Sequence, residues 1–287
     1  MTYHLIRADP AKNITILVLD RIPPEDRLPL AKAIMQDPAL KAEQVGFAIP
    51  PASANGLWRL EMMGGEFCGN AARSFGLYAA KMQNLQGQLQ VSIAISGMDT
   101  PVAINLDMQT NWAEAVIPGP RWVSWKPETK PLGSSAPPKG SVEYAGLALP
   151  VCALEGITHI LAPGIAPQED AFYAIKAAAE GHGFQASALG VMFFEPSPLP
   201  ARELVMNPAV YVYASNSLVF ESSCGSGSIA LGCYLSRDWE EGERRYDIRQ
   251  PGGVIQARIT KVNGEIRSTA IGGTVTLQEL QWEPSAH

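Results

Sequence analysis

The chain has 287 residues and a formal net charge of −6, with 46% hydrophobic and 17% charged residues. This length accommodates two domains of ordinary size, and the globular composition excludes a disordered chain. The acidic balance, without a cluster of Lys or Arg, argues against a nucleic-acid partner, and no apolar run of about eighteen residues predicts a membrane span.

Cysteine and histidine usage limits the class of protein further. Residues 1–7 lack the long apolar core of a secretory signal, so we expect a cytoplasmic protein. Four cysteines without a Cys-x-x-Cys spacing do not indicate a disulfide framework. Only four histidines are present, so a structural zinc site would need nearly every soft ligand in the chain. The sequence predicts reduced thiols and no metal.

Taken in chain order, the first part of the sequence alternates between strand and helix patterns. A helix is predicted from Pro29 to the residue before Pro38, because proline suits the first helical turn and ends a helix when it follows one. Strands are predicted at residues 4–7 and 14–20, around residue 48, and at 58–62 and 89–95.

The second part follows a segment rich in Pro, Gly and Ser over 118–141, which marks the crossing between domains. A helix is predicted over 167–181, and Asn263 and Gly264 suit a hairpin turn. Strands are predicted at 147–154, 188–195, 209–213, 254–260 and 273–277. We expect an N-terminal domain of 1–125, completed by about 274–287, a linker over 126–141 and a C-terminal domain of 142–273.

Two stretches of the chain repeat one another. They share a Cys-Gly pair, a Gly eight places after the Cys and a Tyr ten places after it. The repeats begin at Cys68, Gly69, Asn70 and Ala71, and at Cys224, Gly225, Ser226 and Gly227. Each is typical of a cysteine on a tight turn that leads into a helix packed through small residues. A fold with two related halves places one thiol in each half.

A cysteine at a helix start lies at the positive end of the helix dipole, which predicts a lowered thiol pKa. The free backbone N–H groups of the next three residues form an anion site. If both helix starts face one cavity, a substrate carboxylate binds there and its Cα lies between the two sulfurs. The carboxylate-binding groups are then Gly69, Asn70 and Ala71, with Gly225, Ser226 and Gly227. Cys68 and Cys224 are the predicted acid and base, with charge stabilised where it develops.

Residues 64–73 resemble the first cysteine motif of the diaminopimelate epimerases, and residues 223–227 resemble the second. The resemblance covers most of the chain. It implies an α+β fold of two pseudo-symmetric domains, each a mostly antiparallel sheet or barrel around a central helix. It also implies a racemase or epimerase that uses two thiols and no cofactor. By the same resemblance, Asn13 contacts the substrate and His159 assists the first cysteine.

The chain departs from that family where the distal end of diaminopimelate is bound. Ile157 and Gly190 stand in place of two asparagines, and Ser215 with Asn216 in place of a Glu-Arg pair. A distal carboxylate then lacks its bidentate arginine, so we expect a smaller or differently polar side chain on the substrate. The short form of the segment before Cys68 resembles the histidine racemases associated with metallophore synthesis, which implies conversion of L-histidine to D-histidine.

Three hypotheses remain open. The first is a pyridoxal-independent amino-acid racemase acting on histidine; the second keeps the fold but takes diaminopimelate, proline or hydroxyproline. The third is a redox or zinc-binding protein that uses Cys68, Cys224 and His159. The partner of Cys224 is left open, with Glu221 a candidate, and Arg73 is interpreted as a salt-bridge or interface residue. A homodimer is an expectation from the resemblance.

Overall fold

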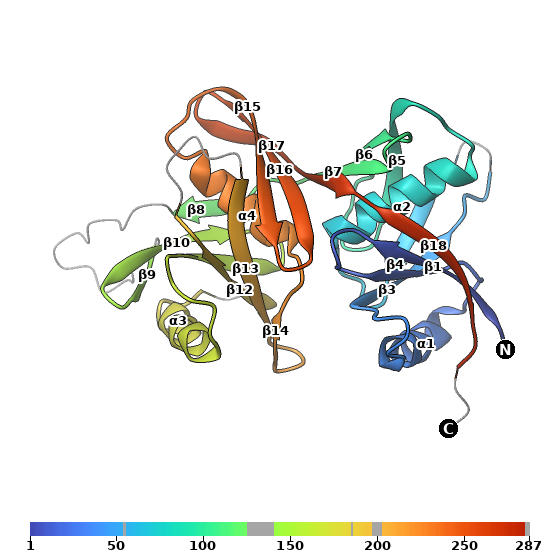
Figure 1. Cartoon of the computed structure of the whole chain (residues 1–287), viewed down its shortest axis with the longest axis horizontal. Helices are drawn as coiled ribbons and strands as arrows, with labels where there is room; N and C mark the ends of the chain where they lie inside the picture. Colours follow the sequence, from blue (N-terminus) through green and yellow to red (C-terminus); the bar gives the residue numbers. More distant parts are fainter. Residues whose placement is uncertain (54–55, 125–140, 185, 197–202, 285–287) are drawn as a thin grey trace. The chain divides into compact units, whose positions relative to one another are not determined.

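The computed structural model describes residues 1–53, 56–124, 141–184, 186–196 and 203–284. The chain divides into two compact units, one of Met1–Ile117 with Ala270–His287 and the other of Pro118–Thr269 (Figure 1). The predicted linker over 126–141 lies almost wholly outside the described residues, so the predicted domain bounds stay a prediction. None of the helices in the described ranges is long and apolar enough to cross a bilayer, and the cytoplasmic location stays a prediction.

The first unit combines a mostly antiparallel sheet with two helices. Its helices are α1 (Pro24–Gln36) and α2 (Gly69–Met82). Its strands are β1 (Tyr3–Asp9), β2 (Thr15–Val18), β3 (Gln44–Ile49), β4 (Trp58–Met62), β5 (Gln88–Ile95), β6 (Val102–Asp107), β7 (Trp112–Ile117) and β18 (Thr276–Trp282). Strands β2 and β3 are parallel, as are β4 and β5, because a helix carries the chain back between the members of each pair.

The second unit likewise combines a mostly antiparallel sheet with helices. Its helices are α3 (Glu169–Gly181) and α4 (Gly225–Leu235). Its strands are β8 (Trp122–Ser124), β9 (Ser141–Tyr144), β10 (Leu147–Ala153), β11 (Ile157–Pro163), β12 (Ala188–Phe194), β13 (Glu203–Val212), β14 (Ser217–Phe220), β15 (Gly242–Gln250) and β16 (Gly253–Val262), and β17 (Glu265–Thr274) contributes residues to both units. Strands β11 and β12 are parallel, as are β13 and β15.

The two units repeat one order of strand pairings. In the first, β1–β2 is antiparallel, β2–β3 parallel, β3–β4 antiparallel, β4–β5 parallel and β5–β6 antiparallel. In the second, the same alternation runs through β10–β11, β11–β12, β12–β13, β13–β15 and β15–β16. Helices α2 and α4 occupy the same place in this order. The predicted α+β fold of two similar, mostly antiparallel halves is confirmed.

The glycine eight places after each repeated cysteine lets its helix pack closely against a strand. A Cβ on Gly76 would lie 2.7 Å from Ile104 Cγ1 in β6, and one on Gly232 would lie 3.1 Å from Ile259 Cγ1 in β16. Strands β6 and β16 hold the same place in the pairing order. The repeated small residues therefore bring α2 and α4 close to equivalent strands, as the motif predicts.

One predicted helix boundary is wrong. Helix α1 starts at Pro24, not at Pro29, and Pro29 lies inside it. Pro24 occupies a first-turn position, where its missing N–H costs nothing. Pro29 leaves the carbonyl of Glu25 without its helical donor, but this turn of the helix is exposed and water can replace the donor. The predicted end before Pro38 and the hairpin turn at Asn263 and Gly264, both with positive φ, are confirmed.

Candidate active site

The two repeated cysteines have one local geometry. Cys68 is the N-cap of α2, with φ −131° and ψ 116°, and its Sγ accepts a hydrogen bond from the N–H of Ala71 at 3.5 Å. Cys224 is the N-cap of α4, with φ −126° and ψ 113°, and its Sγ accepts one from the N–H of Gly227 at 3.4 Å. Each sulfur therefore takes the place of the oxygen that usually caps a helix, and it occupies the N–H group of the third residue after the cysteine.

The second copy of the motif requires glycine at its third position after the cysteine. A Cβ on Gly227 would lie 2.1 Å from Met192 Sδ and 3.3 Å from Cys224 Sγ. The corresponding residue of the first copy is Ala71, which is fully buried. The difference between the two motifs thus follows from the strand packed against α4.

The environment of Cys68 is polar and comes from three segments. Burial raises the pKa of its thiol, and this is opposed by hydrogen bonds from the backbone of Ala71 and Asn70 and from the side chain of Gln44. Gln44 Nε2 also donates to Asn13 Oδ1 at 2.9 Å, and Asn70 Nδ2 donates to the same oxygen at 3.1 Å. Asn13 and Asn70, both predicted from sequence, are therefore bonded to each other, and Gln44 joins them to the sulfur.

Asn13 has little hydrogen-bonding capacity left for a ligand. Its Oδ1 accepts the two bonds from Gln44 and Asn70, and its Nδ2 donates to Glu43 Oε2 at 2.7 Å. An asparagine amide has two donor hydrogens, so one of them remains for substrate. No pattern in the sequence singled out Gln44 or Glu43, because Gln44 begins an ordinary strand and Glu43 directly precedes it.

His159 lies in the same unit as Cys224 and reaches it through Ser226. Its Nε2 is 2.9 Å from Ser226 Oγ, and that oxygen is 3.5 Å from Cys224 Sγ. Burial lowers the pKa of His159 to about 3, so the ring is neutral at physiological pH. Its Nδ1 has no hydrogen-bond partner among the described residues. The resemblance assigned this histidine to the first cysteine, whereas the contacts within the second unit link it to Cys224.

Gly190 provides the space for that histidine. It pairs with His159 across β11 and β12, and a Cβ at position 190 would lie 2.3 Å from His159 Nδ1. Ser215 and Asn216 form the turn between β13 and β14, where Tyr211 donates a hydrogen bond to Asn216 Oδ1. These two residues precede β14, whereas Cys224 follows it, and their interpretation as replacements for a distal Glu-Arg pair stays a prediction.

Glu221 is the carboxylate beside Cys224. Burial raises the pKa of the Cys224 thiol well above its ordinary value, and the negative charge of Glu221 and its hydrogen bond to the thiol raise it further. A thiol pKa lowered by the helix dipole, predicted from sequence for both cysteines, is wrong for the free protein. Desolvation is the largest cause at both sites and outweighs the backbone hydrogen bonds at the helix starts, which lower the thiol pKa values.

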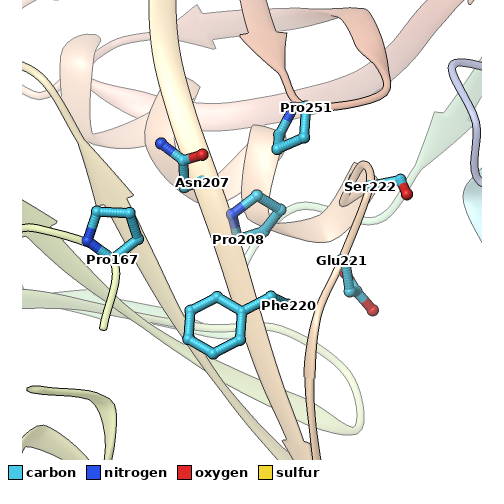
Figure 2. Close-up of a pocket in the computed structure, with 7 residues that line it drawn as sticks. All are labelled: Pro167, Asn207, Pro208, Phe220, Glu221, Ser222 and Pro251. Atoms are coloured by element: carbon cyan, nitrogen blue, oxygen red, sulfur yellow. The ribbon is translucent and has the colours of Figure 1, made fainter. Parts of the chain in front are cut away.

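A pocket of about 270 Å³ adjoins Glu221. It is lined by Pro167, Asn207, Pro208, Phe220, Glu221, Ser222 and Pro251 (Figure 2). Figure 2 shows the Phe220 ring and the Glu221 side chain projecting in different directions from the end of β14. Glu221 is the one ionisable side chain among these lining residues, so the carboxylate beside Cys224 forms part of the pocket wall.

The remaining cysteines are free and lie in the core. Cys152 and Cys233 are fully buried, and burial raises the pKa of Cys233 to about 12. Among the described residues, no group of three His, Cys, Asp or Glu side chains is placed to hold a metal ion.

The fold is similar to those of several solved proteins. A hydroxyproline epimerase from Agrobacterium vitis, with bound trans-4-hydroxy-L-proline, is similar with a TM-score of 0.59 at 11% identity, covering 99% of this chain and 92% of that one. A putative phenazine biosynthesis PhzC/PhzF protein from Clostridium difficile (strain 630) is similar with a TM-score of 0.57 at 13% identity, covering 99% and 98%.

Sequence comparison identifies the family. The family model described as "Histidine racemase CntK N-terminal domain" matches residues 2–279. A histidine racemase from Fusobacterium nucleatum subsp. nucleatum is 31% identical over 259 residues, covering 88% of this chain and 87% of that protein. The chain belongs to the histidine racemase CntK family.

Proposed function

We propose that this protein is a cofactor-independent histidine racemase in which Cys68 and Cys224 exchange the Cα proton on opposite faces of the substrate. The observation that carries this proposal is the duplicated cap geometry, in which each sulfur sits among backbone N–H groups at a helix start. Family membership supports the substrate, since the relatives are histidine racemases.

The reaction needs one thiolate and one thiol at the same time. The thiolate removes the Cα proton and becomes a thiol, while the electron pair of the C–H bond passes into the carboxylate as an enediolate. The second thiol then donates its proton to the other face of Cα and becomes a thiolate. Binding the carboxylate at the amides of Gly69, Asn70, Ala71, Gly225, Ser226 and Gly227 stabilises the enediolate charge.

The neighbours of Cys224 suit a group that starts as the acid. The charge of Glu221 favours the protonated thiol, and Ser226, held by neutral His159 at 2.9 Å, keeps a hydroxyl next to the sulfur. After each turnover the two sulfurs have exchanged protonation states. Resetting the pair requires Cys68 to release its proton to solvent and Cys224 to gain one, and Glu221, which lines a pocket, relays the proton that Cys224 gains.

A racemisation assay in deuterium oxide tests the proposal. L-histidine and D-histidine should each lose optical rotation and gain deuterium at Cα without pyridoxal phosphate, whereas diaminopimelate and trans-4-hydroxy-L-proline should not exchange. Absence of exchange with both histidine enantiomers would overturn it. Exchange of another amino acid instead would retain the reaction and reject histidine as the substrate.

Single cysteine variants separate the proposed acid and base from the other thiols. Cys68→Ser and Cys224→Ser should each abolish racemisation, leaving at most slow exchange of one enantiomer. Cys152→Ala and Cys233→Ala are the matched controls, because both thiols are free and buried in the core. They should retain activity at temperatures where they remain folded.

Proximity of the two proposed catalytic sulfurs has its own test. Mild oxidation should link Cys68 to Cys224 in a disulfide, identified by mass spectrometry of peptides, and reduction should restore activity. Failure of this pair to cross-link, with Cys68 instead joined to another molecule, would contradict a shared cavity. Light scattering on the reduced protein tests the homodimer expected from the family.

A further inference from the structure

Arg73 is a buried cation without a carboxylate partner. It lies in α2 and is fully buried. Its Nε donates to Asn70 Oδ1 at 3.1 Å, one terminal nitrogen donates to the carbonyl of Gly273 at 2.8 Å, and the other to that of Pro10 at 3.3 Å. All three acceptors are neutral, and among the described residues no carboxylate lies within salt-bridge distance. The salt bridge expected from sequence is therefore not found.

Such a charge is costly to bury, so a nearby anion would offset the cost. Burial lowers the pKa of Arg73 to about 10, which still leaves the guanidinium charged at neutral pH. Cys68, in its anionic form, opposes that lowering. Because the interaction between two charges is mutual, the cation favours the Cys68 thiolate, whereas the carboxylate of Glu66 opposes it.

Hydrogen bonds connect the cation to the sulfur through side chains. Arg73 fixes the oxygen of Asn70, and the amide nitrogen of Asn70 then donates to Asn13. Gln44 donates to the same oxygen of Asn13 and also hydrogen-bonds to Cys68. Removing Arg73 would free Asn70 to rotate and loosen this chain.

The second repeat has no such cation. The residue five places after Cys68 is Arg73, and the residue five places after Cys224 is Ile229, which is fully buried. The carboxylate of Glu221 acts on Cys224 instead. The two caps are alike in backbone geometry, and each has a carboxylate nearby, but only the first repeat adds a buried cation.

We propose that Arg73 is a positioning residue that makes Cys68 the first of the two thiols to ionise, through its buried charge and through the chain of Asn70, Asn13 and Gln44. Cys224, without a cation at the equivalent position, keeps its proton more tightly. This assignment of base and acid in the free protein rests on the proposed function, to which it adds the direction of the first proton transfer.

Alkylation of each cysteine across a range of pH tests the proposal. Iodoacetamide labelling is followed at Cys68 and Cys224 separately by mass spectrometry of peptides. In the wild type the midpoint for Cys68 should lie below that for Cys224. Arg73→Gln should raise the Cys68 midpoint by about one pH unit, Arg73→Lys should keep it near the wild-type value, and neither should move the Cys224 midpoint.

Lys261→Met is the matched control for loss of a buried cation. Lys261 Nζ donates to the carbonyls of Ser236 and Arg237 at 3.1 and 3.4 Å, so this variant should lose stability without changing the Cys68 midpoint. An unchanged Cys68 midpoint in Arg73→Gln, or equal shifts at both cysteines, would overturn the proposal.

A second variant covers the case in which Arg73→Gln does not fold. Asn70→Asp keeps the bond to Arg73 and neutralises the cation, so it should also raise the Cys68 midpoint, and no rise would overturn the proposal. Histidine racemisation is measured separately. If the wild type racemises histidine but Arg73→Gln does not shift the Cys68 midpoint, only the role of Arg73 is rejected. If the wild type is inactive on histidine, the proposed function is rejected.

Discussion

Replacing Gly190 by alanine should displace the His159 ring while leaving the backbone intact. The hydrogen bond from His159 to Ser226, which lies beside Cys224, would then be lost. The added Cβ would lie 2.3 Å from His159 Nδ1, 2.8 Å from His159 Cε1 and 3.0 Å from Met192 Cε. The first two atoms belong to a fully buried ring. The ring must therefore move, and it carries with it the 2.9 Å bond to Ser226.

The expected destabilisation has two parts. Overpacking of a core site costs about 1–3 kcal/mol, and loss of a buried hydrogen bond costs about 1–3 kcal/mol. The gain from replacing glycine inside a strand is about 0.5–1 kcal/mol. Gly190→Ala should therefore lower the free energy of unfolding by about 1–5 kcal/mol and, in the folded fraction, reduce kcat for histidine more than it raises KM.

The matched control is the equivalent glycine of the first unit. Gly46 pairs with Leu17 across the parallel strands β2 and β3, as Gly190 pairs with His159 across β11 and β12. A Cβ on Gly46 would meet Leu60 Cδ1 at 2.7 Å and Met62 Sδ at 3.3 Å, which are the ends of flexible side chains. Gly46→Ala should cost less and leave kcat near wild type. Urea unfolding and steady-state racemisation measure both variants, and equal losses of kcat in the two would refute the role of His159.

Three further predictions concern pH and packing. Glu221→Gln should lower the alkylation midpoint of Cys224, because the carboxylate raises the pKa of that thiol; a midpoint that rises or stays would contradict the contact. His159 has a pKa of about 3 in the folded protein against 6.5 unperturbed. As the pH falls, the unfolded chain therefore binds a proton at this histidine before the folded protein does. The contribution of neutral His159 to the free energy of unfolding is fully present above about pH 6.5. It is lost as the pH falls toward 3, by about 2 kcal/mol between pH 7 and pH 5. Urea unfolding at both pH values should show a smaller loss of stability in His159→Gln than in the wild type. An identical loss in the variant would refute the assignment of this pH dependence to His159. Gly76→Ala should destabilise by about 1–3 kcal/mol, because its Cβ would lie within 2.9 Å of three atoms of Ile104. Gly232→Ala, at 3.1 Å or more from its neighbours, should be nearly neutral because alanine gains about 1 kcal/mol in a helix, and thermal unfolding that ranks the two in reverse order would contradict the packing.

The local geometry of the site could be predicted from sequence because short-range rules determine it. A small polar residue before a run of Gly, Ala and Ser caps a helix whatever surrounds it, and the repeat predicts the same cap at Cys68 and Cys224. Strands with buried alternation were predicted for the same reason. Strand β15 was missed because residues 242–245 are exposed and three of them are charged, a pattern typical of a loop. Its pairing with β16 makes it a strand.

The electrostatics of the site could not be predicted in this way. The pKa of a thiol depends on how much water the completed fold removes, and that depends on residues distant in sequence. Ser226 lies 67 residues from His159, and Gln44 lies 31 residues from Asn13. The helix dipole was a correct local cause, but desolvation by the tertiary structure is larger at both cysteines.

The difference between the two repeats matters more for turnover than their likeness. Two thiols in identical surroundings would share one pKa, and below it both would be protonated, so that no base would be present to begin the reaction. Arg73 beside Cys68 and Glu221 beside Cys224 break that equivalence in opposite directions. In the proposed mechanism each cap contributes amides to the carboxylate, and the unlike charges determine which of the two thiols loses its proton first. If Arg73→Gln and Glu221→Gln each bring the two alkylation midpoints closer together, the double variant should bring them closest and racemise histidine most slowly.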